Sequence, residues 1–243
     1  KEPLSAELTD GICASVERNL PECKMLILSD YAKGVCTKTL LQRVLRLAAA
    51  HQIPVVVDPK SSDFSDYAGA SLITPNLLEL QRAARTAITD IEEIAGFAHT
   101  VIQQHDIAHM LVTLGSRGML LVDADSHYHI PAHHCDVYDV SGAGDTVIAT
   151  ISAMLTASDD MVKAMSYGNL AASKVVAKLG TASLCPGELI SAGQHDNKSW
   201  TIDILTEQIG TWQAEGLKIG FTNGCFDLMH AGHIQLLKAC AEK

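Results

Sequence analysis

The 243-residue chain is short of basic residues, and it has no apolar run long enough for a membrane span. Lysine and arginine number 18 against 28 acidic residues, so the formal net charge is −10. A general nucleic-acid binder would instead carry a basic face. A transmembrane helix needs roughly 20 consecutive apolar residues. We therefore expect neither a nucleic-acid partner nor a membrane partner.

Paired cysteine motifs are also absent. The seven cysteines are scattered, their number is odd, and no two have the spacing C-x-x-C. This pattern argues against a disulfide framework and against a zinc ribbon, and it is typical of reduced thiols. The first residues carry no signal-peptide pattern. We therefore predict a cytoplasmic protein in which Cys135 and Cys225 are buried small hydrophobic residues rather than nucleophiles.

Apolar runs of strand length alternate with segments of helical periodicity along most of the chain. The predicted strands cover residues 25–28, 55–57, 71–74 and 110–113, and the predicted helices cover residues 37–51, 77–85, 91–104, 143–156 and 159–179. Residues 119–122 and 127–130 read as a hairpin. This alternation predicts an α/β fold, a mostly parallel sheet with helices on both faces.

The predicted strands end in polar or glycine-rich sequence. Asp30 follows the first strand, Asp58 and Lys60 the second, Asn76 the third and Gly115 the fourth. In open α/β sheets, ligands bind beyond the carboxyl ends of the strands. These residues are therefore expected to converge on one edge of the sheet and to form a site there.

The most informative stretch is Asp139-Val-Ser-Gly-Ala-Gly-Asp145, followed by an apolar run that predicts a helix. Free backbone N–H groups at a helix start attract anions such as phosphate, and Asp145 is placed to take a proton from an attacking hydroxyl. A tight turn with Asp145 as a first-turn carboxylate is the alternative, and the local pattern leaves it open. The stretch is no P-loop, and Val147 stands where a G-x-G-x-x-G motif has its third glycine.

A second cluster of glycine and histidine lies near the end of the chain. Residues 187–199 read as a polar linker, residues 202–214 as a short helix and residues 217–221 as a strand. His230 and His233 follow that strand, where imidazoles can donate to phosphoryl oxygens. Their H-x-x-H spacing lacks the helical glutamate of a protease zinc site.

Four further histidines invite a metal interpretation, because His127 and His129 share one face of a predicted strand and His133 and His134 follow it. No nearby carboxylate or cysteine completes an evident ligand set. A surface hairpin is the reading that the spacing favours.

Several of these segments resemble known motifs. Residues 139–145 resemble the D-T-x-G-A-G-D element of ribokinase-like sugar kinases, with Val140 where the pattern often has threonine. Asn76-Leu-Leu-Glu79 resembles the N-x-x-E element of that family, which organises Mg²⁺ and phosphate through water. Residues 113–118 resemble its strand and turn beside the nucleotide.

Two more segments narrow the resemblance. Residues 29–34, Ser-Asp-Tyr-Ala-Lys-Gly, resemble the D-Y-x-K-G segment of heptose and related kinases, and residues 222–233 resemble the first motif of small nucleotidyltransferases. Kinase motifs followed by a nucleotidyltransferase motif are similar in order to those of bifunctional heptose-7-phosphate kinase / heptose-1-phosphate adenylyltransferases. The resemblance implies a kinase domain over residues 1–190 without its N-terminal part, a linker and helix over 191–215, and a truncated Rossmann-like nucleotidyltransferase domain over 216–243.

The resemblance also implies roles around the phosphoryl group. Asp145 would deprotonate the anomeric hydroxyl of the sugar, and the N–H groups of Gly142, Ala143 and Gly144 would hold the γ-phosphoryl group. Asn76 and Glu79 would orient water bound to Mg²⁺. A capping box at the start of a helix is the alternative for this pair, and both readings can hold together.

Further residues are implied at the nucleotide. Thr113, Gly115 and Gly118 would shape its site, with a plain hairpin turn as their alternative. Asn169 would lie near the adenine, with a solvated helix residue as its alternative. Lys60, like Lys33, would contact phosphate, although an exposed lysine is the commoner case.

The implied reaction is ATP-dependent phosphorylation of heptose 7-phosphate, with ATP and Mg²⁺ as cofactors and a fused adenylyltransferase for lipopolysaccharide precursor synthesis. The resemblance also suggests a homodimer, since kinases of this type often pair through their lids. Two alternatives stay open at this point: a kinase for another sugar phosphate, and a nucleotide-binding fragment without catalysis.

Overall fold

The computed structural model describes residues 4–178 apart from 134 and 136, residues 180, 182–185 and 187–189, and scattered positions between 206 and 239. Contacts divide the chain into two units, Lys1–Gly193 and Gln194–Lys243. The continuous elements below belong to the first unit. Most of the predicted linker, helix and strand over residues 187–221 lies outside the described residues, and the predicted domain boundaries stay a prediction.

A six-stranded sheet forms the centre of the first unit's described part, with its strands in sequence order. The strands are β1 (Leu26–Ser29), β2 (Val55–Asp58), β3 (Leu72–Ile73), β4 (His109–Thr113), β5 (Met119–Val122) and β6 (His127–Ile130). Strands β1 to β4 are parallel neighbours, whereas β4, β5 and β6 pair antiparallel. The mostly parallel sheet and the terminal hairpin are therefore confirmed.

Six helices accompany the sheet among the described residues. They are α1 (Ala6–Asn19), α2 (Lys38–Ala50), α3 (Leu77–Ala84), α4 (Ile91–His105), α5 (Ala143–Leu155) and α6 (Met161–Val176). Short 3₁₀ turns cover Leu20–Glu22 (η1), Phe64–Tyr67 (η2) and Gly115–Arg117 (η3). Helix α1 lies before residue 25, where no element was predicted. Its few core positions, Thr9 and Cys13, give it a weak apolar pattern, and its N-cap residue is Ser5, whose side chain accepts from the N–H of Leu8.

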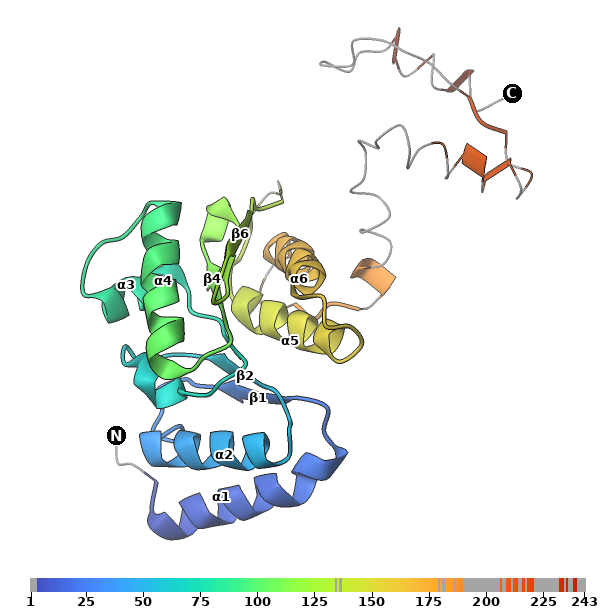
Figure 1. The fold of residues 1–243 in the computed structure, drawn as a ribbon. Coiled ribbons are helices and arrows are strands. Elements are labelled where there is room, and N and C mark those ends of the chain that lie inside the picture. The colour runs from blue at the N-terminus through green and yellow to red at the C-terminus, as the bar shows by residue number, and fades with distance from the viewer. Residues whose placement is uncertain are drawn as a thin grey trace. The chain divides into compact units, whose positions relative to one another are not determined.

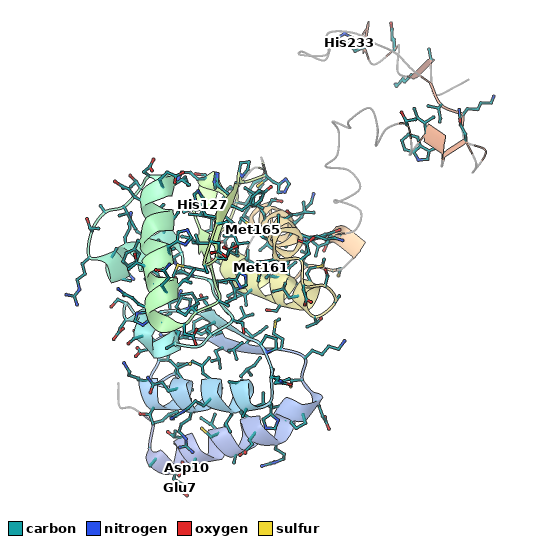
Figure 2. The ribbon with its side chains drawn as sticks, in the orientation of Figure 1. Glu7, Asp10, His127, Met161, Met165 and His233 are labelled. Atoms are coloured by element: carbon teal, nitrogen blue, oxygen red, sulfur yellow. The ribbon has the colours of Figure 1, made fainter. Side chains whose placement is uncertain are left out.

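The helices cover both faces of the sheet, as predicted. Successive strand residues point to opposite faces, so Val55 and Val57 pack in one core with α2 and α4, whereas Val56 packs in a second core with α5 and α6. Figure 1 shows α4 and the α5–α6 pair on opposite sides of the sheet. Met165 on α6 is fully buried in the second core (Figure 2). Burial on both faces explains why β2 is a continuous apolar run.

Over the residues that the structure describes, none of the helices has the length and hydropathy that a membrane crossing requires.

Candidate active site

Two cavities lie on either side of the start of α5, beyond the carboxyl ends of the parallel strands. The smaller, about 230 Å³, is lined largely by polar side chains and is called the polar cavity below. The larger, about 480 Å³, is lined mainly by apolar groups. The two share Thr113, Gly144 and Val147. The polar side chains that line the polar cavity are Tyr31, Asp58, Lys60, Thr74, Asn76, Thr113, Glu79 and Asp145.

The start of α5 has the backbone shape that its glycines predict. Gly142 is the N-cap residue with φ 78°, in the left-handed region that favours glycine. Before it, the Asp139 carboxylate accepts from the N–H of Ser141 at 2.8 Å, and this hydrogen bond lowers the pKa of Asp139. The N–H of Ala143 donates to the carbonyl of Val140 at 3.3 Å, so it is partly committed. Gly144 lies in the first turn, where N–H groups have no acceptor within the helix.

Asp145 lies in that first turn, and its side chain is exposed at the edge of the polar cavity. The hydroxyl of Tyr31 donates to it, at 3.0 Å from Oδ1 and 3.2 Å from Oδ2. Tyr31 lies in the loop just after β1, separated from it by Asp30, so this contact joins the end of the first strand to α5. The carboxylate is therefore directed toward the strand ends and lines the polar cavity, while its neighbour Gly144 lines both cavities.

Lys60 and Glu79 form an ion pair opposite Asp145. Glu79 is buried, and it also closes the capping box of α3: its Oε2 accepts from the N–H of Asn76 at 2.9 Å, and its own N–H donates to Asn76 Oδ1 at 2.9 Å. The capping alternative for this pair is thus present in the structure. The same geometry orients both side chains at the polar cavity, so the two readings hold together.

Charge crowding perturbs two groups in the polar cavity. Burial, opposed by Lys60 and reinforced by Glu79 and Asp145, raises the pKa of Asp58 from 3.8 to about 6. Burial acts to lower the pKa of Lys60, but its hydrogen bond to Glu79 and the nearby carboxylates outweigh burial and raise it. The polar cavity holds one ammonium group and several carboxylates, so it carries an excess of negative charge. A polyphosphate can therefore bind there only if a cation or the N–H groups of α5 offset the repulsion.

A buried tyrosine ties the loops after β1 and β2 together. Tyr67 is fully buried; its hydroxyl donates to Asp30 Oδ2 at 3.0 Å and accepts from the N–H groups of Lys60 at 3.1 Å and Ser61 at 2.9 Å. Asp30 in turn accepts from the N–H of Ala32 at 2.8 Å. Through these bonds the backbone on either side of Tyr31 and that of Lys60 share one anchor.

The larger cavity contains the residues predicted at the nucleotide. Thr113, Gly115, Gly118 and Asn169 all line it. Gly115 and Gly118 both have positive φ in the turn after β4, and a Cβ at Gly118 would overlap the carbonyl oxygen of Ile130. The turn reading of these glycines is therefore present alongside their position at the cavity. Asn169 is buried and donates to the carbonyl of Pro131 at 2.8 Å, so its alternative as a solvated helix residue was wrong.

The structure also bears on the predictions for Cys135 and for the histidines of residues 127–134. Cys135 is exposed and lines the larger cavity, so its predicted burial was wrong, because it forms part of that cavity's wall rather than of the packed core. Within the described part of the chain, no three His, Cys, Asp or Glu residues group as metal ligands. His129 instead contacts the carbonyl of Arg117 at 2.8 Å. His127 on β6 lies 3.5 Å from Glu92 (Figure 2).

The second predicted site is not assembled by the described residues. His230 and Cys225 lie outside them, and His233 is described without residues 221–231.

Sequence reasoning gave no role to three residues that the structure brings to or beside the polar cavity. Tyr31 belongs to the 29–34 motif and Asp58 to a strand end, whereas Tyr67 lies in no motif. Position at or just after the carboxyl end of a parallel strand was the signal that could have selected Tyr31 and Asp58. No sequence signal selects Tyr67, because its partners lie 37 and 7 residues away along the chain.

Comparison with known proteins agrees with this geometry. Residues 2–187 match the family described as pfkB family carbohydrate kinase. The chain belongs to this family. The resemblance to ribokinase-like sugar kinases is thereby confirmed, and a sugar kinase is the class of enzyme to which the chain is assigned.

The chain is also similar to curated proteins named bifunctional protein HldE. It is 40% identical to that of Pelobacter propionicus, over 97% of this chain and 50% of the relative, and 40% identical to that of Rhodopseudomonas palustris, over 98% and 50%. The chain thus spans about half the length of these relatives.

Solved structures share the fold. Phosphofructokinase-2 from Escherichia coli superposes with a TM-score of 0.68 at 18% identity, covering 79% of this chain and 63% of that chain. Ribokinase from Thermotoga maritima gives 0.62 at 20%, covering 73% and 59%. Ribokinase from Arabidopsis thaliana, solved with ribose and ATP, gives 0.60 at 18%, covering 74% and 56%. At these identities the likeness establishes the ribokinase-like fold.

The residues of the polar cavity fit a magnesium ion held mainly through water. Mg²⁺ keeps several waters and usually takes one or two carboxylates together with substrate phosphates. A carboxylate has about four lone-pair positions, and Glu79 uses one on Lys60 and one on Asn76. Glu79 therefore retains acceptor capacity for a water ligand, and Asp58 faces the same cavity.

Proposed function

We propose that this chain carries the kinase activity of an enzyme that phosphorylates D-glycero-β-D-manno-heptose 7-phosphate at its anomeric hydroxyl, with ATP as donor, to give the 1,7-bisphosphate. The observation that carries the proposal is the position of Asp145. Its carboxylate stands at the start of α5 and lines a polar cavity with room for an acceptor, while the adjacent Gly144 also lines a larger, mainly apolar cavity with room for a nucleoside. Family membership supports the same class of reaction.

In this proposal Asp145 acts as the general base. Its carboxylate takes the proton of the anomeric hydroxyl as that oxygen forms a bond to the γ-phosphorus, and the bond from this phosphorus to the β,γ-bridging oxygen breaks to release ADP. The first-turn N–H groups of α5, led by Gly144, donate to the transferring group as its charge develops. The helix dipole adds a favourable field at the same place.

Lys60 and Glu79 complete the polar side of the proposed site. Lys60 supplies a cation beside the transferring phosphoryl group, and the buried Glu79 holds Lys60 and orients water. Mg²⁺, when bound, would neutralise phosphate charge. The pairing of Lys60 with Glu79 explains how a lysine stays charged within a partly buried cavity.

The choice of acceptor rests on similarity to the HldE proteins together with the Asp30-Tyr31-Ala32-Lys33-Gly34 segment. The alignment with the relative from Pelobacter propionicus spans 242 residues and so continues beyond residue 187, where the kinase family match ends. We therefore also propose that the longer protein carries an adenylyltransferase that begins with the motif around His230 and His233. The homodimer and the cytoplasmic location stay predictions.

The experiment is an acceptor panel. The chain is incubated with ATP, Mg²⁺ and one of three acceptors: heptose 7-phosphate, fructose 6-phosphate or ribose. The products are then assigned by ³¹P NMR. The proposal expects a new anomeric phosphate from the heptose, formed at least tenfold faster than product from the others. Preferential turnover of another acceptor would transfer the assignment to that sugar, and ATP binding without any product would leave a nucleotide-binding fragment.

A further inference from the structure

Tyr31 contacts the proposed general base, Asp145, from a distant part of the domain sequence. Its hydroxyl lies 3.0 and 3.2 Å from the two carboxylate oxygens of Asp145, although the two residues are 114 positions apart in the chain. Among the described residues, no other side chain donates a hydrogen bond to that carboxylate. The contact also spans the polar cavity, because both residues line it.

The backbone that carries Tyr31 is fixed on both sides. Asp30 is buried and accepts from the N–H of Ala32 and from the hydroxyl of Tyr67. Ala32 has φ 50°, a left-handed conformation that a residue with a Cβ adopts only where its surroundings impose it. The Tyr31 side chain itself is 55% exposed. Hydrogen bonds of the neighbouring Asp30, rather than burial of the ring, therefore hold the loop that carries Tyr31.

The side chain of an exposed aspartate in the first turn of a helix can adopt another orientation. Its carboxylate can turn back toward the N–H groups of its own helix, where the dipole also favours it. A base held in that way would compete with phosphate for the N–H groups of α5. The hydrogen bond from Tyr31 draws the Asp145 carboxylate away from them and toward the strand ends.

The contact leaves room for a substrate. A carboxylate has about four lone-pair positions, and one phenol hydroxyl uses only part of them. The proton stays on the phenol throughout, because Tyr31 only donates a hydrogen bond. An acceptor hydroxyl can therefore bind a remaining lone pair of Asp145 while Tyr31 keeps its own contact.

We propose that Tyr31 is a positioning residue, which holds the Asp145 carboxylate at the polar cavity in the orientation that receives the acceptor hydroxyl. This inference rests on the proposed function for its consequence in turnover. Its geometric part, the contact between phenol and carboxylate in solution, stands independently of any activity.

The first measurement needs no turnover. The chain is labelled with 3-fluorotyrosine, which gives one ¹⁹F signal for each of its five tyrosines, and the Tyr31→Phe variant assigns the signal of Tyr31. Asp145→Ala is expected to shift that signal, whereas Asp159→Ala, at an exposed carboxylate in the α5–α6 connection, is expected to leave it in place. A Tyr31 signal unchanged by Asp145→Ala would overturn the inference.

The second measurement separates positioning from stability. Tyr31→Phe is expected to lower kcat for heptose 7-phosphate about tenfold, the loss of one hydrogen bond to a charged group, with the KM for ATP within twofold and an unchanged melting temperature. The matched control is Tyr128→Phe, which removes a hydroxyl from a half-exposed tyrosine on β6 and is expected to change none of these.

The outcomes keep the two proposals apart. No phosphoryl transfer by the wild-type chain would refute the proposed function, and the ¹⁹F shift would still decide whether Tyr31 holds Asp145. A transferring wild type with an unchanged kcat in Tyr31→Phe would refute the positioning role alone. A fall in melting temperature together with a raised KM for ATP would show a structural role and would also overturn it.

Discussion

Replacing Tyr67 by phenylalanine removes a single buried hydroxyl that anchors two loops of the candidate site. The hydroxyl donates to Asp30 and accepts from the N–H groups of Lys60 and Ser61. The substitution adds no atom, and the ring keeps its place in the core beside Phe64. Its effect therefore comes from the three lost hydrogen bonds and from the polar groups that lose a partner.

The magnitude follows from those three bonds. The bond to the Asp30 carboxyl contributes about 1.5 kcal/mol, and each of the two amide bonds contributes about 1 kcal/mol when its donor is left without a partner. The expected loss in free energy of unfolding is about 3.5 kcal/mol. For a unit of this size, 1 kcal/mol corresponds to roughly 2–4 °C in melting temperature, so we expect a decrease of about 10 °C.

The assay is urea unfolding followed by circular dichroism, together with a thermal melt. Tyr128→Phe serves as the control, because it makes the same chemical change at a half-exposed position on β6 and is expected to stay within about 0.5 kcal/mol of wild type. A Tyr67→Phe variant that melts within 2 °C of wild type, by the same estimate of roughly 2–4 °C per kcal/mol, would refute the anchoring role.

Two further substitutions test the polar cavity and the turn after β4. Because the pKa of Asp58 is raised from 3.8 to about 6, the folded chain binds more protons than the unfolded chain in that window, and wild-type stability falls as the pH rises through it. The full shift corresponds to about 3 kcal/mol, and solvent screening reduces this to about 1 to 2 kcal/mol. Asp58→Asn should therefore be more stable than wild type by that amount at pH 7, and the difference should vanish only below pH 3.8, where the carboxyl is protonated in both states. A constant difference across urea titrations at these pH values would contradict the assignment. Gly118→Ala should lower the free energy of unfolding by about 3 kcal/mol or more in the same titration, because the added Cβ meets the backbone of Ile130. Gly115→Ala is the control: its Cβ has open space, and it should cost about 1 kcal/mol. Equal losses in the two variants would argue against the close approach at Gly118.

Much of the fold was predictable because it follows local rules. The valine run of β2 and the helical spacing of residues 40–48 each indicate their element without reference to distant residues. The positions of Asn76 and Glu79 at the start of α3 likewise follow from a capping pattern three residues long. Helix α1 was missed because its pattern is weak and its burial comes from packing against α2.

The candidate site was predictable where a motif spans consecutive residues and where polar residues follow the ends of parallel strands, as Asp58, Lys60 and Asn76 do. The 139–145 stretch predicted a helix start with Asp145 in its first turn, and the structure has one. The contact of Tyr31 with Asp145 and the anchor at Tyr67 depend on loops brought together by the sheet, so no local pattern encodes them. The exposure of Cys135 was mispredicted for the same reason: burial depends on which element covers a loop, and the composition of that loop does not say.

The role of Asp145 as the general base can be tested directly by one comparison. Turnover of heptose 7-phosphate and the calorimetric Kd for ATP–Mg²⁺ are measured for wild type, Asp145→Asn and the control Asp159→Asn. We expect Asp145→Asn to lower kcat roughly a thousandfold, in the range for loss of a general base, with a Kd for ATP within threefold of wild type, and Asp159→Asn to change neither. A kcat for Asp145→Asn within tenfold of wild type would contradict the claim.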